Sequence, residues 1–136
     1  MSGLDTLIRL HQQHLDVKRV YRTTIEARRI GLEQRCYAIQ QEMEDEKEHA
    51  AESLEARQTY PAYTERMTAA LQELAVEMAE TDKEINRLND EIAEAFQTLK
   101  GYELTRDARE KRLALELAQR ERTELDEIGA TQHRRH

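Results

Sequence analysis

The 136-residue sequence predicts an all-α protein, a single coiled-coil domain in which two helices form an antiparallel hairpin. Three observations support this fold class. Charged residues make up 36% of the chain and aromatic residues 4%, which leaves too little apolar surface for a globular core but enough for narrow stripes. Apolar residues recur with heptad spacing in the second half of the chain. The single proline, Pro61, lies near the middle, where a hairpin would turn.

The proline predicts where each helix begins and ends. Proline is tolerated in the first turn of a helix, and it disfavours the α conformation of the residue before it. We therefore expect one helix over about residues 4–57, a bend over about 58–62 and a second helix over about 61–128. Gly129 favours a left-handed helix end, so residues 130–136 are expected to form a disordered tail.

The second helix carries the clearer seam of apolar residues, spaced alternately four and three apart. Its positions are Met67, Leu71, Leu74, Met78, Thr81, Ile85, Leu88, Ile92, Ala95, Leu99 and Tyr102. Only Thr81 is polar, which makes this a strong heptad pattern. The first helix is less regular, because Arg29 and Glu46 interrupt its seam.

Folding the chain at residue 60 aligns the two seams. Paired residue numbers then sum to about 120, so that Met43 faces Met78 and Cys36 faces Ile85. Leu32 would likewise face Leu88. A parallel homodimer of one bent helix would satisfy the same heptads, and this alternative stays open.

The seam changes character after Tyr102, because its next two positions are Arg106 and Arg109. Two apolar stripes follow. The first stripe continues the old face with Leu113, Leu117, Leu125 and Ile128. The second stripe lies on another face and consists of Leu104, Ala108, Leu115 and Ala118.

The first helix is too short to cover both stripes. Pairing by number places Arg106 near Leu15 and Arg109 near His11, and it leaves residues beyond about 117 without a partner. We therefore expect exposed leucines framed by arginines to form a partner-binding surface. The simpler alternative is that these leucines are scattered exposed residues of the kind found on most proteins.

Charge is distributed unevenly along the expected hairpin. Residues 42–84, around the bend, carry thirteen acidic and four basic side chains, so their net charge is −9, whereas the remaining residues carry +2. Basic residues therefore gather where the two ends meet, although a charged face that is only solvated is the simpler interpretation. Interleaved acidic residues and a total charge of −7 argue against binding to nucleic acid.

The sequence contains no motif that indicates catalysis. It has no glycine-rich phosphate loop, no zinc-protease motif and no nucleophile elbow, so we expect neither an enzyme nor a cofactor. His11 and His14 could share a metal with His133 or His136, but no carboxylate or cysteine converges with them, so no metal site is expected. The lone Cys36 fits a reducing compartment. The absence of a long apolar run or a signal-peptide core predicts a cytoplasmic protein that does not insert into a membrane.

Four segments resemble the flagellar export protein FliJ family in its α-proteobacterial form. They are MSGLDTLIRLHQQHLDVKR at the start, TYPAYTERM at the expected bend, EAFQTLKGYELTRDARE, and RERTELDEIG near the end. The most specific part is the acidic run of Leu125, Asp126 and Glu127 behind a helix rich in arginine and glutamate. The resemblance covers nearly the whole chain.

The resemblance implies a function in flagellar type III protein export. It implies a coiled coil similar to the central stalk of rotary ATPases, which promotes assembly and turnover of the hexameric export ATPase. Further implied partners are export chaperones and the cytoplasmic domain of the export gate, at the inner membrane beneath the flagellum. The residues implied to contact the ATPase are Arg9, Arg19, Arg22, Leu104, Arg106, Arg109, Leu115, Leu125, Asp126 and Glu127. Those implied to contact the gate are Met43, Tyr60, Tyr63 and Met67, and the two tyrosines are expected to be exposed.

Two other functions remain open at this point. One is a homodimeric coiled-coil spacer with no connection to an ATPase. The other is the stalk protein of a virulence type III secretion system, which shares the same architecture.

Overall fold

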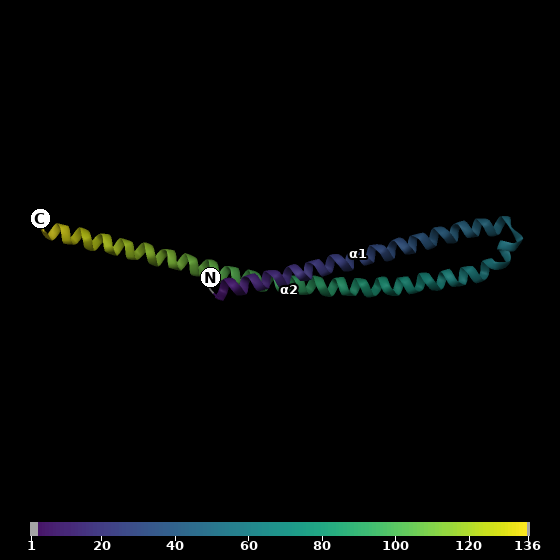
Figure 1. Cartoon of the computed structure of the whole chain (residues 1–136), viewed down its shortest axis with the longest axis horizontal. Helices are drawn as coiled ribbons and strands as arrows, with labels where there is room; N and C mark the ends of the chain where they lie inside the picture. Colours follow the sequence, from purple (N-terminus) through teal and green to yellow (C-terminus); the bar gives the residue numbers. More distant parts are fainter. Residues whose placement is uncertain (1–2, 136) are drawn as a thin grey trace. The chain divides into compact units, whose positions relative to one another are not determined.

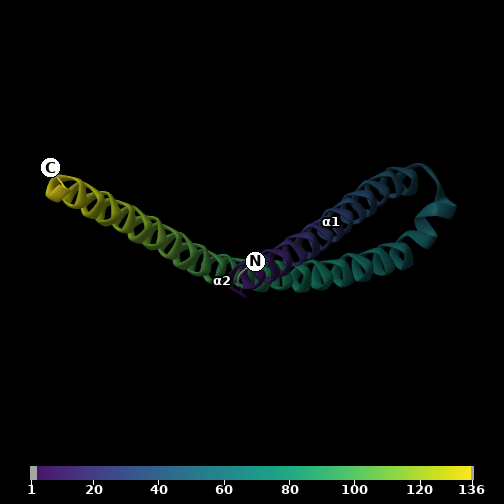
Figure 2. The same cartoon turned by 60° about the vertical axis from the view of Figure 1, so that its left-hand side comes forward.

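The structure, a computed structural model, describes residues 3–135 and consists of two helices. Helix α1 spans Gly3–Glu52 and helix α2 spans Leu54–Arg135, so Ser53 is the only described residue outside a helix. The two helices pack against each other in opposite directions, as both views show (Figure 1 and Figure 2). The predicted fold class, an all-α two-helix hairpin, is confirmed.

The chain divides into two compact units, which we describe separately. The hairpin unit consists of residues 16–93 and contains the turn between the helices. The terminal unit consists of the described parts of residues 1–15 and 94–136.

The core of the hairpin unit is a single seam between α1 and α2. Its buried residues are Leu32, Ala50, Ala56, Leu74, Thr81, Leu88 and Ile92. Ile25, Cys36, Ile39 and Met43 are half-buried at the intervening heptad positions of α1. The seam predicted from spacing is therefore the one that the helices bury, because heptad positions return to the same face of a helix.

Three polar side chains in the seam of α1, Lys18, Arg22 and Arg29, meet polar partners on α2. The Lys18 Nζ atom lies 3.5 Å from a Glu91 carboxylate oxygen, and Arg22 donates a hydrogen bond of 2.9 Å to the Asn89 side chain. The Arg29 guanidinium donates to the Asp82 carboxylate. The polar interruption at Arg29 is thus matched across the interface.

The helices break at Ser53, so the predicted bend over residues 58–62 is wrong. The Ser53 hydroxyl oxygen accepts a hydrogen bond of 3.3 Å from the Ala56 backbone N–H, as an N-cap residue does. The Arg57 guanidinium donates to the carbonyl oxygens of Ala50 and Ala51, both at 3.3 Å, at the end of α1. A backbone N–H at the start of α2 and two carbonyl oxygens at the end of α1, which lack partners within their own helices, are therefore hydrogen-bonded at the turn.

Pro61 lies inside α2 rather than at its start. A proline removes one backbone hydrogen bond and can kink a helix without ending it. Its ring is exposed, so it does not disturb the buried seam. The first helix consequently ends at Glu52 and not near residue 57, and the second begins at Leu54.

The earlier turn also corrects the predicted register. The cross-helix pairs Lys18–Glu91, Arg29–Asp82 and His11–Tyr102 have residue numbers that sum to 109, 111 and 113, not to about 120. The difference is close to one heptad, so the predicted seam residues still face inwards although their partners change. The pairs expected on that register, including Leu32 with Leu88 and Arg109 with His11, were therefore misassigned.

In the terminal unit, the start of α1 packs against the middle of α2. Ile8, Leu15 and Leu99 are buried, and the rings of His11 and Tyr102 stack with their centroids 5.0 Å apart. Beyond Arg106, α2 continues to Arg135 as helix, and all of these described residues are exposed.

The predicted helix end at Gly129 and the disordered tail are also wrong. Gly129 lies within α2 without a positive φ angle, and residues 130–135 are helical, while residue 136 lies outside the described part of the chain. His133, Arg134 and Arg135 occupy the last turn. Basic side chains there interact favourably with the negative end of the helix dipole, which helps the helix to continue past the glycine.

Candidate partner-binding surface

The most prominent candidate surface is the part of α2 that continues past the start of α1, which we call the extension (residues 107–135). At about 1.5 Å per residue it is about 43 Å long. It continues past the start of α1 in both views (Figure 1 and Figure 2). Because α1 covers α2 only as far as Arg106, the uncovered part begins about ten residues earlier than the predicted position of about 117.

Large apolar side chains of the extension are exposed. Leu113, Leu115, Leu117, Leu125 and Ile128 are between 54% and 68% exposed. Exposed leucines that stand singly are common on proteins, whereas several that share one face of a helix mark an interaction site more often.

The two stripes predicted from the sequence lie on different faces of this helix. With about 100° of rotation per residue, the first stripe occupies an arc about 120° wide. It continues the face on which Leu99 and Tyr102 pack against α1. The second stripe, which includes Leu104 at 68% exposure, lies roughly 130° away on the same helix. One partner helix could therefore cover only one of the two.

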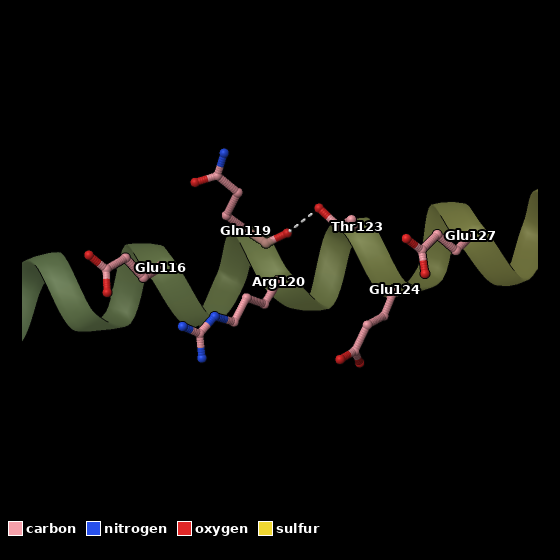
Figure 3. Close-up of a pocket in the computed structure, with 6 residues that line it drawn as sticks. All are labelled: Glu116, Gln119, Arg120, Thr123, Glu124 and Glu127. Atoms are coloured by element: carbon pink, nitrogen blue, oxygen red, sulfur yellow. Dashed lines mark hydrogen bonds between the residues drawn. The ribbon is translucent and has the colours of Figure 1, made fainter.

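A third face of the extension is polar. A shallow hollow is lined by Glu116, Gln119, Arg120, Thr123, Glu124 and Glu127, all from this one helix (Figure 3). The only hydrogen bond drawn among them runs from the Thr123 hydroxyl to the Gln119 carbonyl oxygen, at 3.0 Å (Figure 3). No second element closes the hollow in the described part of the chain, so this face is an open surface and not a ligand pocket.

The residues implied to contact an ATPase do not all lie in one unit. Arg9, Leu104, Arg106, Arg109, Leu115, Leu125, Asp126 and Glu127 belong to the terminal unit, and all except Arg106 are exposed. Arg106 is half-buried at the last covered position and donates to the Asp107 carboxylate at 3.4 Å.

The other two implied residues belong to the hairpin unit. Arg22 is held by Asn89 and lies 3.5 Å from Glu26, while Arg19 lies 3.9 Å from Asp16. Both guanidinium groups are therefore engaged within their own unit.

The residues implied to contact an export gate all lie in the hairpin unit. Met43, Tyr60, Tyr63 and Met67 are half-buried, so the expectation of two exposed tyrosines is wrong. The Tyr63 hydroxyl is buried and has no hydrogen-bond partner among the described residues. Burial raises the pKa of Tyr63, and the nearby carboxylates Glu42 and Glu46 raise it further.

The described residues contain no cluster of three or more histidine, cysteine or acidic side chains that could hold a metal ion. His11 stacks on Tyr102, and the alternative ligand His136 lies outside the described residues. Cys36 is a half-buried free thiol in the seam. No helix between residues 3 and 135 is long and apolar enough to cross a membrane.

Sequence reasoning missed Ser53 and the polar pairs across the seam. The sequence does contain a signal for the helix start at Ser53, because serine is a preferred N-cap and Glu55 follows in the first turn of α2. The polar pairs across the seam have no local signal in the sequence, since paired residues such as Arg29 and Asp82 are 53 positions apart.

Comparison of the chain with protein-family models, with curated proteins and with solved structures gave no match.

Proposed function

We propose that the chain is the central-stalk and chaperone-escort component of a flagellar type III protein export apparatus. In this proposal it binds the hexameric export ATPase and the cytoplasmic domain of the export gate, at the cytoplasmic side of the inner membrane. The observation that carries the proposal is the exposed extension with its apolar stripes. The choice of this partner rests on the resemblance of four sequence segments to the FliJ family.

The second stripe is the surface that we assign to the ATPase. Leu104 and Leu115 are 68% and 64% exposed and point away from the face that packs on α1. Burying one leucine side chain contributes about 1.5–3 kcal/mol, so a partner that covers both gains a substantial part of a micromolar affinity. The neighbouring Lys111 can contribute electrostatic attraction to an acidic rim.

The proposed mechanism follows from a difference in symmetry. A single helix inside a six-membered ring cannot contact all subunits equally. A subunit that contacts the stalk is shifted towards the conformation that binds the stalk more tightly, so subunits with different contacts adopt different conformations. Such a stalk promotes hexamer assembly and sets the order of turnover among the subunits.

The contacts with the gate and the chaperones rest on the resemblance alone. Met43, Tyr60, Tyr63 and Met67 are half-buried, so a gate domain would contact only their exposed edges. The strongly acidic surface around them would favour a basic partner surface.

The proposal is tested by measuring ATP hydrolysis of the export ATPase from the same cell with and without the purified chain. We expect the wild-type chain to stimulate hydrolysis, and the double variant Leu104→Glu, Leu115→Glu to lose most of the stimulation because both anchors become charged. Leu54→Glu is the matched control, since Leu54 lies on the same helix and is also 68% exposed.

The possible results separate the open functions. A wild-type chain that neither binds nor stimulates the flagellar ATPase contradicts the proposal and leaves the coiled-coil spacer. Stimulation of a virulence-type ATPase but not of the flagellar one assigns the chain to that system instead. Circular dichroism of each variant checks that helicity is retained.

A further inference from the structure

The charged edge of the extension, beside its first stripe, has a pattern that is complementary to itself. Six charged residues follow one another along this edge within an arc about 120° wide. In chain order they are Arg109, Arg112, Glu116, Arg120, Glu124 and Glu127. Their signs are plus, plus, minus, plus, minus, minus. The same row read backwards has the opposite sign at every position.

Most of these charges have no ion-pair partner within the described chain. Arg112 lies 3.9 Å from Glu116, while Arg109, Arg120, Glu124 and Glu127 take part in no ion pair within residues 3–135. Arg109 and Glu127 are 18 residues apart, which is about 27 Å along a helix. They therefore cannot pair within one molecule.

We propose that the extension binds the extension of a second copy of this chain, in antiparallel orientation, with the two helices crossing near residue 118. In this register Arg109 faces Glu127 of the second copy, Arg112 faces its Glu124 and Glu116 faces its Arg120. By symmetry each of these contacts occurs twice. In a parallel two-fold pair the two copies of this row would lie on opposite sides of the interface, so none of these ion pairs could form.

The same register also brings the first stripes of the two copies together. Leu117 lies close to its counterpart at the crossing point, and Leu113 lies within about 3 Å along the axis of Leu125 of the second copy. The second copy would thus cover this face only from residue 107 to about residue 129, because α1 covers it up to Arg106, and it would bury leucines that are exposed in the single chain.

The pairing is expected to be weak. Glu110 and Glu121 interrupt the first stripe, and exposed ion pairs contribute little to affinity while they do select register and orientation. We therefore expect association in the micromolar range. The second stripe lies outside this interface, so the inference does not depend on the proposed ATPase contact.

The experiment is sedimentation equilibrium of the full chain between about 1 and 500 µM, a range that brackets a micromolar dissociation constant. The apparent mass should rise from 16.0 kDa towards twice that value. Arg109→Glu and Glu127→Arg should each raise the dissociation constant about tenfold, because each converts two attractive contacts into repulsive ones. The double variant carrying both changes should return to within about twofold of wild type.

Lys111→Glu is the matched control. It changes the net charge as Arg109→Glu does, but Lys111 lies on the opposite side of the helix, so its dissociation constant should not change. Orientation is tested by oxidation in a Cys36→Ser background. Leu117→Cys should form a disulfide-linked dimer, whereas Thr131→Cys should not, because the two copies of residue 131 lie at opposite ends of an antiparallel pair.

Three results would overturn the inference. They are a chain that stays at 16.0 kDa throughout the range, a double variant that fails to recover, and Thr131→Cys that cross-links as well as Leu117→Cys. None of them bears on stimulation of an ATPase, which is measured with the second-stripe variants. A wild-type chain that self-associates but neither binds nor stimulates the ATPase would conversely contradict only the proposed function.

Discussion

The Tyr63 hydroxyl is buried near Glu42 and Glu46 without a hydrogen-bond partner among the described residues. A buried polar group without a partner reduces the free energy of unfolding, because it gives up hydrogen bonds to water and gains none. Burial and the two carboxylates also disfavour the phenolate, so the pKa of Tyr63 lies above its ordinary value of 10.0 in the folded chain.

We predict that Tyr63→Phe increases stability at pH 7 and removes a loss of stability at alkaline pH. Since the pKa of this acid is raised by folding, its contribution is fully present below about pH 10 and is lost as the pH rises through the folded-state pKa. Urea midpoints at pH 7 and pH 11 measure both effects. Tyr37→Phe is the control, because Tyr37 is 65% exposed. An equal alkaline loss in Tyr63→Phe and wild type would contradict the prediction.

At the level of the helices, the turn is determined by capping and not by proline. Ser53 satisfies a backbone N–H of α2 and Arg57 satisfies two carbonyl groups of α1. Pro61, seven residues after the start of α2, costs a hydrogen bond but leaves the helix continuous. The chain therefore turns at Ser53, where the backbone groups of both helix ends are hydrogen-bonded, and not at Pro61, although proline usually marks a break.

We predict opposite effects from substitutions at these two positions. Ser53→Ala should lower the free energy of unfolding by about 0.5–2 kcal/mol, because it removes the cap. Pro61→Ala should raise it by up to about 3 kcal/mol, since alanine restores helix propensity and an N–H donor. Urea unfolding followed by circular dichroism measures both, and Ser53→Asp, which keeps a capping oxygen, should stay near wild type.

The reverse outcome is informative as well. If the chain turned at Pro61, Pro61→Ala would favour one continuous helix and disrupt the hairpin, while Ser53→Ala would have little effect. A lower free energy of unfolding for Pro61→Ala would therefore argue against the turn at Ser53.

The pairing of the helices depends on polar contacts as well as on the apolar seam. The hydrogen bond that Arg29 donates to Asp82 is the main cause of the raised pKa of Arg29, and electrostatic attraction to the same carboxylate adds a smaller contribution. Apolar seams tolerate a slip of one heptad, because every seventh position is equivalent. A charged residue in the seam that requires its own partner disfavours that slip.

For the molecule as a whole, the helical part of the chain is longer than the part in which the two helices pack against each other. Residues 107–135 form helix, and all of them are exposed. Long isolated helices are only marginally stable in water, since most helical stability comes from tertiary packing. The extension is thus the least stable helical segment.

We predict that hydrogen exchange reveals this difference directly. At concentrations at which the chain is monomeric, backbone amides of residues 110–135 should exchange at least about tenfold faster than those of the packed residues 74–99. Equal protection of the two segments would contradict the uncovered position of the extension. Protection of residues 109–127 that increases with concentration would accompany the proposed self-association.

The sequence alone predicts the two-helix class, the residues of the seam and the two stripes after Tyr102. These follow from helical periodicity and side-chain polarity, which are local properties of the chain. Ser53 was also visible as a capping residue, but capping serines are frequent and Pro61 offered a stronger signal. The structure places most candidate partner-binding residues on the surface, although Arg19, Arg22 and the four gate residues engage neighbours within the hairpin unit.

Only the tertiary structure decides the position of the turn, the partners across the seam and the point at which α1 stops covering α2. Each depends on residues far apart in the sequence, such as Arg29 with Asp82 or His11 with Tyr102. A turn placed seven residues earlier shortens α1 and shifts the register by about one heptad, and it leaves more of α2 bare. Periodicity determines which face of a helix is buried, whereas the balance of caps and cross-helix pairs determines how far along the helix that burial extends.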